Sequence, residues 1–179
     1  NKKKLYDFLR EMEFNRLLSQ VVSRYGESSE TKIKNLKKGQ MFDLKKYQTI
    51  LKISELETWI KKIEKKGIIA VDTETSSLNP HEANLVGISL CFDSGMACYI
   101  PLEHKTEKIL EKKIVLEKLK NLLEDKSIKK IGQNIKFDFI ILLRNGIKLN
   151  PIEDTMLMSY ALDAGRHRHN MDNLSQVHL

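Results

Sequence analysis

The segment IIAVDTETSSL, residues 68–78, constrains the fold more than any other stretch of this chain. It opens with an apolar, mostly β-branched run, which is the pattern of a strand buried in the middle of a sheet. Asp72 and Glu74 follow with one residue between them, so on an extended chain their side chains leave the same face. A surface turn is the alternative, because Asp and Glu are common there. The segment predicts a central strand followed by two carboxylates.

The overall composition is that of a folded globular chain. Its 179 residues are 41% hydrophobic and 31% charged, which is enough apolar material for one ordinary domain and a smaller attachment. No apolar run approaches the ~18–20 residues of a membrane span, so we expect no membrane partner. Cys91 and Cys98 are expected to be reduced, small apolar residues and not a disulfide or a metal pair. Because the chain begins with Asn1, we expect it to be part of a longer protein.

The formal net charge of +7 is concentrated near the N-terminus. Residues 1–66 contain 17 Lys and Arg against 9 Asp and Glu, whereas residues 67–179 contain 14 against 15. A basic segment of this kind attracts polyanions such as nucleic acid. A generally lysine-rich composition explains the same numbers equally well, so the charge supports a nucleic-acid partner only weakly.

The N-terminal part of the sequence predicts a helix, a linker and a second helix. Apolar residues recur at helical spacing through residues 1–25, and the polar, basic stretch 26–40 indicates a linker. Residues 42–53 have room for one short strand. The sequence SELE then forms a capping box, which predicts a helix with Ser54 as its N-cap that ends near Gly67.

The rest of the sequence alternates between strand and helix patterns. After the strand at 68–71, two strand patterns joined by an Asp-Ser-Gly turn come first, and then a helix, a short strand and further helices. This order predicts an α/β fold that resembles ribonuclease H-like folds, a mixed sheet flanked by helices with acids at the carboxyl end of the first strand. The expected elements are strands 84–92, 96–100 and 128–131, and helices 108–124, 134–145, 155–162 with Asp154 as N-cap, and 171–179.

Asp72 and Glu74 are close enough to repel each other, and a divalent cation between them would relieve that repulsion. Hard carboxylate oxygens suit Mg²⁺ or Mn²⁺, and a two-ion site for phosphoryl transfer, with metals ~3.5–4 Å apart, needs three or four acids. Asp138, in the motif GQNIKFDF, is the third candidate because an acid among apolar neighbours needs a partner or a metal. An acid favoured by the dipole of a helix N-terminus is the alternative for this residue.

The motifs VDTETSSL, NLVGISL, YIPLEH, GQNIKFDF and DTMLMSYALD occur in this order. Together they resemble the 3′→5′ proofreading exonuclease domain of the Klenow-type family A polymerases (bacterial DNA polymerase I), which belongs to the DEDD superfamily. The resemblance runs from about residue 68 to residue 179, and DFLREMEFNRLL is similar to that family's junction with a 5′-nuclease domain. We therefore expect residues 1–40 to be an N-terminal helix and linker, and residues 41–179 to be an exonuclease-like domain that is incomplete at its C-terminus.

The resemblance implies a two-metal site. Asp72 corresponds to the acid that bridges two Mg²⁺ or Mn²⁺ ions, Glu74 to a ligand of the ion that activates water, and Asp138 to a ligand of the other ion. One ion would lower the pKa of the attacking water, and the other would stabilise the leaving 3′ oxygen. The implied reaction is hydrolysis of the 3′-terminal phosphodiester of DNA.

The resemblance also implies a path for the single-stranded 3′ end of DNA. Leu78 corresponds to an apolar wedge beside the last base, and Phe137 stands where a Tyr is often found, which removes one hydroxyl contact. Arg168 matches an arginine near the DNA backbone only loosely. The implied DNA-contacting residues are Thr75, Leu78, Gln133, Asn134, Phe137 and Arg168.

One motif of the family has no counterpart in this sequence. The third exonuclease motif, Y-x-x-x-D, supplies the fourth carboxylate, whereas Tyr160 and Asp163 form only Y-x-x-D. We expect the third motif to lie beyond residue 179. On that expectation the chain by itself has an incomplete metal site and little or no nuclease activity.

Two alternatives to a proofreading exonuclease remain open. A non-catalytic scaffold domain of a family A polymerase is one, although such domains have lost the acids that are present here. A stand-alone DEDD exonuclease acting on DNA or RNA is the other, and the N-terminal junction and YIPLEH weigh against it. The expected partners are the single-stranded 3′ end of DNA and a polymerase domain of the same parent chain, in the bacterial cytoplasm at the nucleoid.

The remaining polar residues near the C-terminus have simpler interpretations. His167 and His169 flank Arg168, and this pattern favours a solvated basic turn over a metal site. Three nearby acids are more typical of helix caps or surface charges than of metal ligands: Asp154, Asp163 and Asp172.

Overall fold

The computed structural model describes residues 2–26, 46–104 and 109–179. The chain divides into two compact units, Asn1–Gln40 and Met41–Leu179, which are described separately below. The linker expected at 26–40 lies outside the described residues except for Gly26, and so does residue 108 at the start of the helix expected at 108–124.

The first unit contains two helices, α1 (Lys2–Glu11) and α2 (Asn15–Tyr25). The prediction of one helix through residues 1–25 is wrong, because the chain turns at Glu13, whose φ is 55°. The turn lets α1 and α2 contact each other, and it buries Tyr6 and Leu9 of α1. The Tyr6 hydroxyl donates a hydrogen bond to the Gly26 carbonyl at 2.6 Å. A single straight helix has no second helix against which to bury its apolar stripe. Burial between two helices is a tertiary interaction, and helical spacing in the sequence does not predict it.

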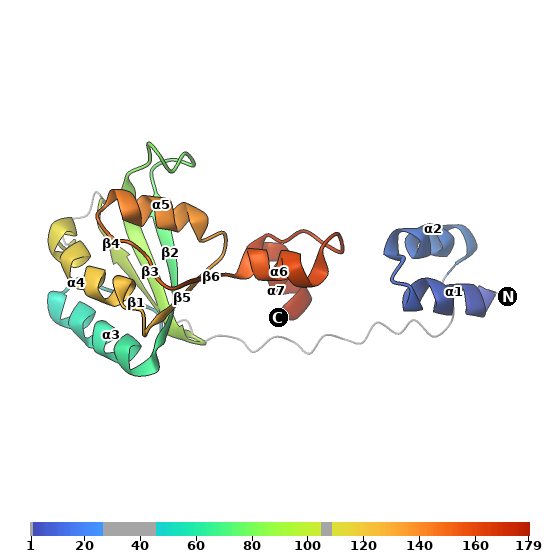
Figure 1. Cartoon of the computed structure of the whole chain (residues 1–179), viewed down its shortest axis with the longest axis horizontal. Helices are drawn as coiled ribbons and strands as arrows, with labels where there is room; N and C mark the ends of the chain where they lie inside the picture. Colours follow the sequence, from blue (N-terminus) through green and yellow to red (C-terminus); the bar gives the residue numbers. More distant parts are fainter. Residues whose placement is uncertain (1, 27–45, 105–108) are drawn as a thin grey trace. The chain divides into compact units, whose positions relative to one another are not determined.

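In the described part of the second unit, six strands form one mixed sheet in the order β1-β4-β3-β2-β5-β6 (Figure 1). Strands β2, β3 and β4 form an antiparallel meander, as predicted, whereas β5 is parallel to β2, β6 to β5, and β1 to β4. The strands are β1 (Gln48–Thr49), β2 (Ile68–Thr75), β3 (Leu85–Asp93), β4 (Met96–Pro101), β5 (Lys129–Gly132) and β6 (Ile152–Asp154). Strand β6 was not predicted, because a three-residue strand exists only through its pairing with β5.

Strand β2 is longer than the apolar run that predicted it. It extends beyond Val71 to Thr75, and Asp72 and Glu74 pair with Ser89 and Gly87 of β3. Pairing with β3 satisfies the backbone of the acidic half, so this half stays extended. The acids therefore lie inside the strand, and the alternative of a surface turn is wrong.

The helices of the second unit are α3 (Ile53–Lys66), α4 (Lys112–Glu124), α5 (Lys136–Arg144), α6 (Thr155–Asp163) and α7 (Met171–His178). Helix α3 ends at Gly67, whose φ is 72°, as predicted. Its predicted N-cap is wrong: the helix begins after Lys52, and Ser54 lies in the first turn. The Glu55 carboxylate reaches back to accept the backbone N–H groups of Lys52 and Leu51 at 3.2 and 3.1 Å, which caps the helix from one turn further on.

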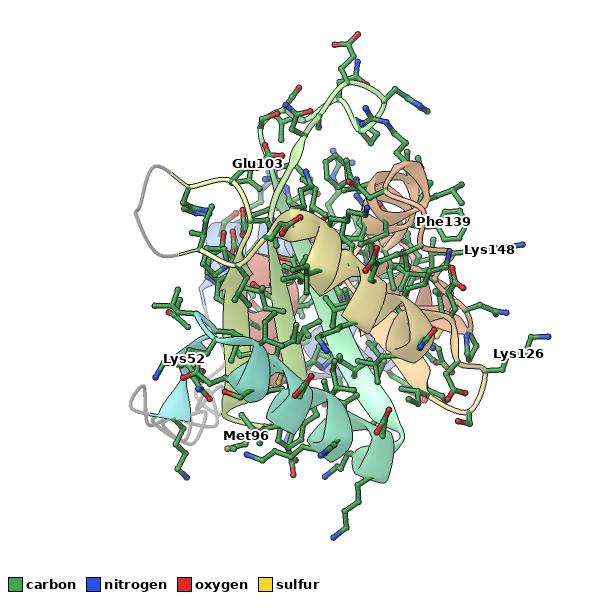
Figure 2. All side chains as sticks on the ribbon, turned by 90° about the vertical axis from the view of Figure 1, so that its left-hand side faces the viewer. Lys52, Met96, Glu103, Lys126, Phe139 and Lys148 are labelled. Atoms are coloured by element: carbon green, nitrogen blue, oxygen red, sulfur yellow. The ribbon has the colours of Figure 1, made fainter. Side chains whose placement is uncertain are left out.

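The core lies between one face of the sheet and helices α3, α4 and α5. Figure 2 shows α3 and α4 side by side across the strands, and these two helices contact each other. The opposite face of the sheet carries Asp72 and Glu74. No helix in the described residues is long and apolar enough to cross a bilayer. The buried apolar side chains include Leu56, Trp59 and Ile63 of α3, Val115, Leu119 and Leu122 of α4, Ile141 and Leu142 of α5, and Ile69, Val71, Ile88, Leu90 and Ile100 of the sheet.

Candidate functional site

The period of β2 places the two acids of the strand on one face, as predicted. Val71 and Thr73 are buried against the helices, while Asp72 and Glu74 alternate with them on the accessible face. Successive side chains of a strand alternate between its faces, so once pairing with β3 keeps this segment extended, the spacing of one residue places both acids on one face.

The third acid approaches the same strand from α5. Asp138 lies in the first turn of this helix and is buried. Its Oδ1 accepts two hydrogen bonds from Thr73, one from the backbone N–H at 2.8 Å and one from the hydroxyl at 2.6 Å. No role for Thr73 was predicted from the sequence. Because this residue lies between two acids that share one face of the strand, its side chain must point to the other face, which the helices cover. This residue joins α5 to the strand that carries the other two carboxylates.

Two of these carboxylates, Asp72 and Asp138, have a raised pKa. Burial, then the negative charge of Asp138, then that of Glu74 raise the pKa of Asp72 to about 6. Burial also raises the pKa of Asp138, against the two hydrogen bonds from Thr73, which lower it, and the Asp154 charge adds to the rise. Among the ion pairs of the described residues, none joins Asp72, Glu74 or Asp138 to a Lys, Arg or His. Within the described residues, negative charge gathers here without a paired cation.

Asp154 supports the site from β6. It is the N-cap of α6, as predicted, and its Oδ1 accepts the Met156 N–H at 2.9 Å. The same carboxylate accepts the backbone N–H groups of Asn134 and Ile135 at 3.0 and 3.1 Å. The helix expected from residue 134 begins at Lys136, because Asn134 has a φ of 56° in the turn that Asp154 holds. Asp154 therefore positions the helix that carries Asp138.

Comparison with known protein families shows which family the chain belongs to. A family model described as 3′-5′ exonuclease matches residues 47–179. The chain belongs to this exonuclease family.

A curated relative supports the same assignment, and two solved structures share the fold. DNA polymerase I of Rhizobium leguminosarum is 39% identical over 158 residues, which covers 77% of this chain and 16% of the polymerase. The chain therefore spans less than a fifth of that relative. NrnC of Brucella melitensis with bound Mg²⁺ has a TM-score of 0.55 at 24% identity, with 74% of this chain and 59% of NrnC covered. Escherichia coli RNase D has a TM-score of 0.53 at 23% identity, with 67% and 30% covered. The predicted ribonuclease H-like α/β fold is confirmed.

In this exonuclease domain, Leu78 lies on the loop between β2 and β3. Its side chain is 95% exposed. The loop is fastened to α5, because Nη1 of Arg144 donates to the carbonyls of Pro80 and Ala83 at 2.7 Å each. Arg144 was missed in the sequence, since an arginine at the end of a helix is ordinarily a dipole partner. Leu78 is therefore an exposed apolar side chain on a loop that hydrogen bonds attach to α5.

The other residues predicted to contact DNA differ in their exposure and in the hydrogen bonds that they make within the chain. Thr75 donates its hydroxyl to the Ser77 carbonyl at 3.0 Å, and Phe137 is half-buried against the core. The amide of Gln133 is used within the chain: Nε2 donates to the His169 carbonyl at 2.7 Å, and Oε1 accepts the Thr155 hydroxyl. The two remaining residues, Asn134 and Arg168, are exposed.

The motif YIPLEH contributes a contact beside Glu74. Its first and last residues, Tyr99 and His104, approach within 3.2 Å between the hydroxyl and Nε2. Burial and the charge of Glu74 raise the pKa of Tyr99. The Tyr99 ring lies directly over Gly87, where a Cβ would come within 2.0 Å of the phenolic oxygen. Gly87 thereby allows an aromatic hydroxyl to lie next to the acid group of the exonuclease domain, a contact that the sequence did not predict.

The basic turn after α6 is not simply solvated. His169 is buried, its ring lies 3.8 Å from that of Tyr160, and its Nδ1 is 2.7 Å from the Ser159 hydroxyl. The interpretation of a solvated turn is therefore wrong for His169, because the turn folds back onto α6. His167 is half-buried, whereas Arg168 between the two histidines points into solvent, as expected.

Proposed function

We propose that this domain hydrolyses the 3′-terminal phosphodiester of single-stranded DNA, and that Asp72, Glu74 and Asp138 hold the divalent metal ions of the reaction. The observation that carries the proposal is that the charges of Glu74 and Asp138 both act on Asp72, with no side-chain cation paired to any of the three among the described residues. DNA is favoured over RNA because the polymerase relative is 39% identical over most of this chain, whereas RNase D is only 23% identical.

The donor set fits Mg²⁺ or Mn²⁺. Three carboxylates provide hard oxygen ligands, and a divalent cation among them would offset the burial and the repulsion that together raise the pKa of Asp72. Such ions supply polarisation of the phosphate and a lowered pKa for the attacking water. The structural neighbour NrnC, solved with bound Mg²⁺, supports this choice of ion.

The residues around the carboxylates hold these side chains in place and orient them. Thr73 fixes one oxygen of Asp138, so this carboxylate has a single orientation and its second oxygen remains for a ligand. Asp154 holds the turn before α5 and thereby the position of Asp138 along the helix. Tyr99 places its hydroxyl beside Glu74 and can donate a hydrogen bond to that carboxylate or to a phosphate oxygen. Leu78 stacks against the last base, a contact that every base can make and that needs no sequence readout.

Two measurements test the proposal. Titration of Mn²⁺ into the 179-residue chain should show binding that Asp72→Ala weakens by at least about tenfold, because a shared ligand is removed. Equal Mn²⁺ binding by both proteins contradicts the assignment of Asp72.

The substrate is tested separately with 5′-labelled DNA and RNA oligonucleotides of matched sequence and added Mg²⁺. We expect slow loss of nucleotides from the 3′ end of DNA, abolished by Asp72→Ala, and less from RNA. Preferential shortening of RNA would instead favour a stand-alone RNA exonuclease, and robust degradation of DNA would contradict the expectation that the chain has little activity by itself.

A further inference from the structure

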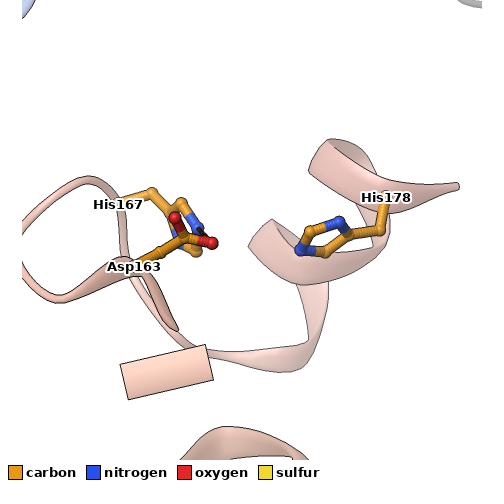
Figure 3. A group of neighbouring side chains, drawn as sticks. All are labelled: Asp163, His167 and His178. Atoms are coloured by element: carbon orange, nitrogen blue, oxygen red, sulfur yellow. Dashed lines mark ion pairs between the residues drawn. The ribbon is translucent and has the colours of Figure 1, made fainter. Parts of the chain in front are cut away.

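A second group of metal-ligating side chains lies on α6, α7 and the turn between them. Asp163 is the last residue of α6, His167 lies in the following turn, and His178 is the last residue of α7. One ligand atom from each residue lies within 4.8 Å of the others. Figure 3 shows Asp163 and His167 side by side, with the imidazole of His178 facing them from α7. None of these residues belongs to the acid group of β2 and α5.

We propose that Asp163, His167 and His178 form a zinc site. Two imidazole nitrogens and one carboxylate oxygen are a borderline donor set that Zn²⁺ prefers, with water in the fourth position. The acid group of Asp72, Glu74 and Asp138 offers oxygen ligands only, which suit Mg²⁺ or Mn²⁺. The two sites of this chain therefore select different metals by ligand chemistry.

The hydrogen bond of His167 sets its tautomer for metal binding. Its Nδ1 lies 2.9 Å from the Arg168 carbonyl, which can only accept, so Nδ1 carries the proton and donates it. Nε2 then has a free lone pair, and it faces Oδ2 of Asp163 at 3.9 Å. A backbone carbonyl that orients a ligating imidazole in this way is a recurrent feature of metal sites. With bonds of about 2.0 Å to a tetrahedral ion, neighbouring ligand atoms lie about 3.3 Å apart, so a small inward movement completes the geometry.

The two carboxylate oxygens of Asp163 contact different side chains. Oδ1 accepts a hydrogen bond from Nη1 of Arg166 at 2.8 Å, and Oδ2 is the oxygen nearest to His167. The arginine orients the carboxylate and leaves one oxygen for the ion. An ion pair between Asp163 and a protonated His167 explains their proximity but assigns no role to His178, which approaches from another helix. The zinc site accounts for all three residues.

Zinc in this position would join the end of α6 to the end of α7. Both helices line an apolar cavity of about 420 Å³ that also includes Gln133. Met171 of α7 and Thr155 of α6 further line a cavity of about 240 Å³ that contains Asp72. The ion would therefore stiffen a wall next to the acid group without touching the acids.

Zinc titration of the 179-residue chain tests the site. Mg²⁺ is kept in large excess to occupy the all-oxygen site, and Zn²⁺ alone is the added probe. We expect one Zn²⁺ per chain, with affinity reduced at least about tenfold in His167→Gln and in His178→Gln. His81→Gln, which changes an exposed histidine on the β2–β3 loop, should bind as the wild type does. Equal affinity in all four proteins, or no zinc binding by the wild type, overturns the proposal.

Nuclear magnetic resonance of the histidine rings in the wild-type chain gives a second test that needs no variant. Addition of Zn²⁺ should shift the Nε2 resonance of His167 and a ring nitrogen of His178, while Nδ1 of His167 remains protonated. Shifts confined to the other histidines would place the ion elsewhere and contradict the assignment.

Discussion

Asp138 of α5 accepts both the backbone N–H and the hydroxyl of Thr73 of β2 on a single carboxylate oxygen. The two residues are 65 positions apart in the sequence. This pair joins the helix and the strand that together carry the proposed metal ligands, and its removal should affect both stability and metal binding.

Thr73→Val should destabilise the domain by about 1.5–3 kcal/mol, because a buried carboxylate loses one of its donors while the side chain keeps its shape. Thr73→Ser is the matched control, since it retains the hydroxyl and should lose less than about 1 kcal/mol. Urea unfolding measures both values. Equal loss in the two variants would show that packing and not the hydrogen bond is responsible.

Asp72→Asn should stabilise the metal-free domain at high pH. The pKa of Asp72 is about 6 in the folded chain and about 3.9 in an unfolded one, so the folded state binds more protons between these values. Stability conferred by Asp72 therefore falls as pH rises through this window. Since the side chain is partly exposed, we expect a gain of only about 1 kcal/mol at pH 8 and none at pH 4.

Urea unfolding in the presence of a chelator checks this pH dependence. Glu82→Gln, an exposed acid on the β2–β3 loop, controls for the general loss of negative charge. A lower stability of Asp72→Asn at pH 8 would argue that the carboxylate is stabilised by a cationic group of the protein, contrary to the arrangement described above.

Gly87→Ala should move Tyr99 away from Glu74. The new Cβ would lie 2.0 Å from the phenolic oxygen, but this is the far end of a side chain that can swing outward, so we expect a stability loss of at most about 1 kcal/mol. The pKa of Tyr99 should fall toward its ordinary value as the ring leaves the acid. Ultraviolet titration of the phenols measures the change, and Tyr99→Phe identifies the signal that belongs to this residue. An unchanged titration would mean that the backbone moves instead of the ring.

Arg144→Ala should loosen the loop that carries Leu78. Two hydrogen bonds from a charged group to the Pro80 and Ala83 carbonyls are lost, and amide exchange over residues 76–84 should accelerate about tenfold or more. Single-stranded DNA should then bind more weakly, because Leu78 must be ordered before it can stack. Lys148→Ala removes an exposed positive charge just beyond α5 and serves as the control. If both variants weaken DNA binding equally, the effect of Arg144 is one of charge and not of loop position.

Local features of the sequence predicted the parts of the fold that depend on near neighbours. The alternation of β2 placed Asp72 and Glu74 on one face, and the left-handed Gly67 ended α3 where expected. Asp154 was recognised as the N-cap of α6 because capping requires only the next few residues. The prediction that Asp138 joins the acids of β2 rested on its apolar surroundings and on a family resemblance, since no local rule brings a helix residue to a strand far away in the chain.

The sequence alone determined the period of each element and therefore which side chains share a face. The tertiary structure decided which faces meet. Only the folded chain places Thr73 against Asp138, joins the two ends of YIPLEH over Gly87, and buries Lys130 with its ammonium donating to the Asp125 and Asn150 carbonyls. Contacts of this kind depend on loop closure, burial and hydrogen bonds between distant segments, for which the spacing of residues along the chain carries no signal.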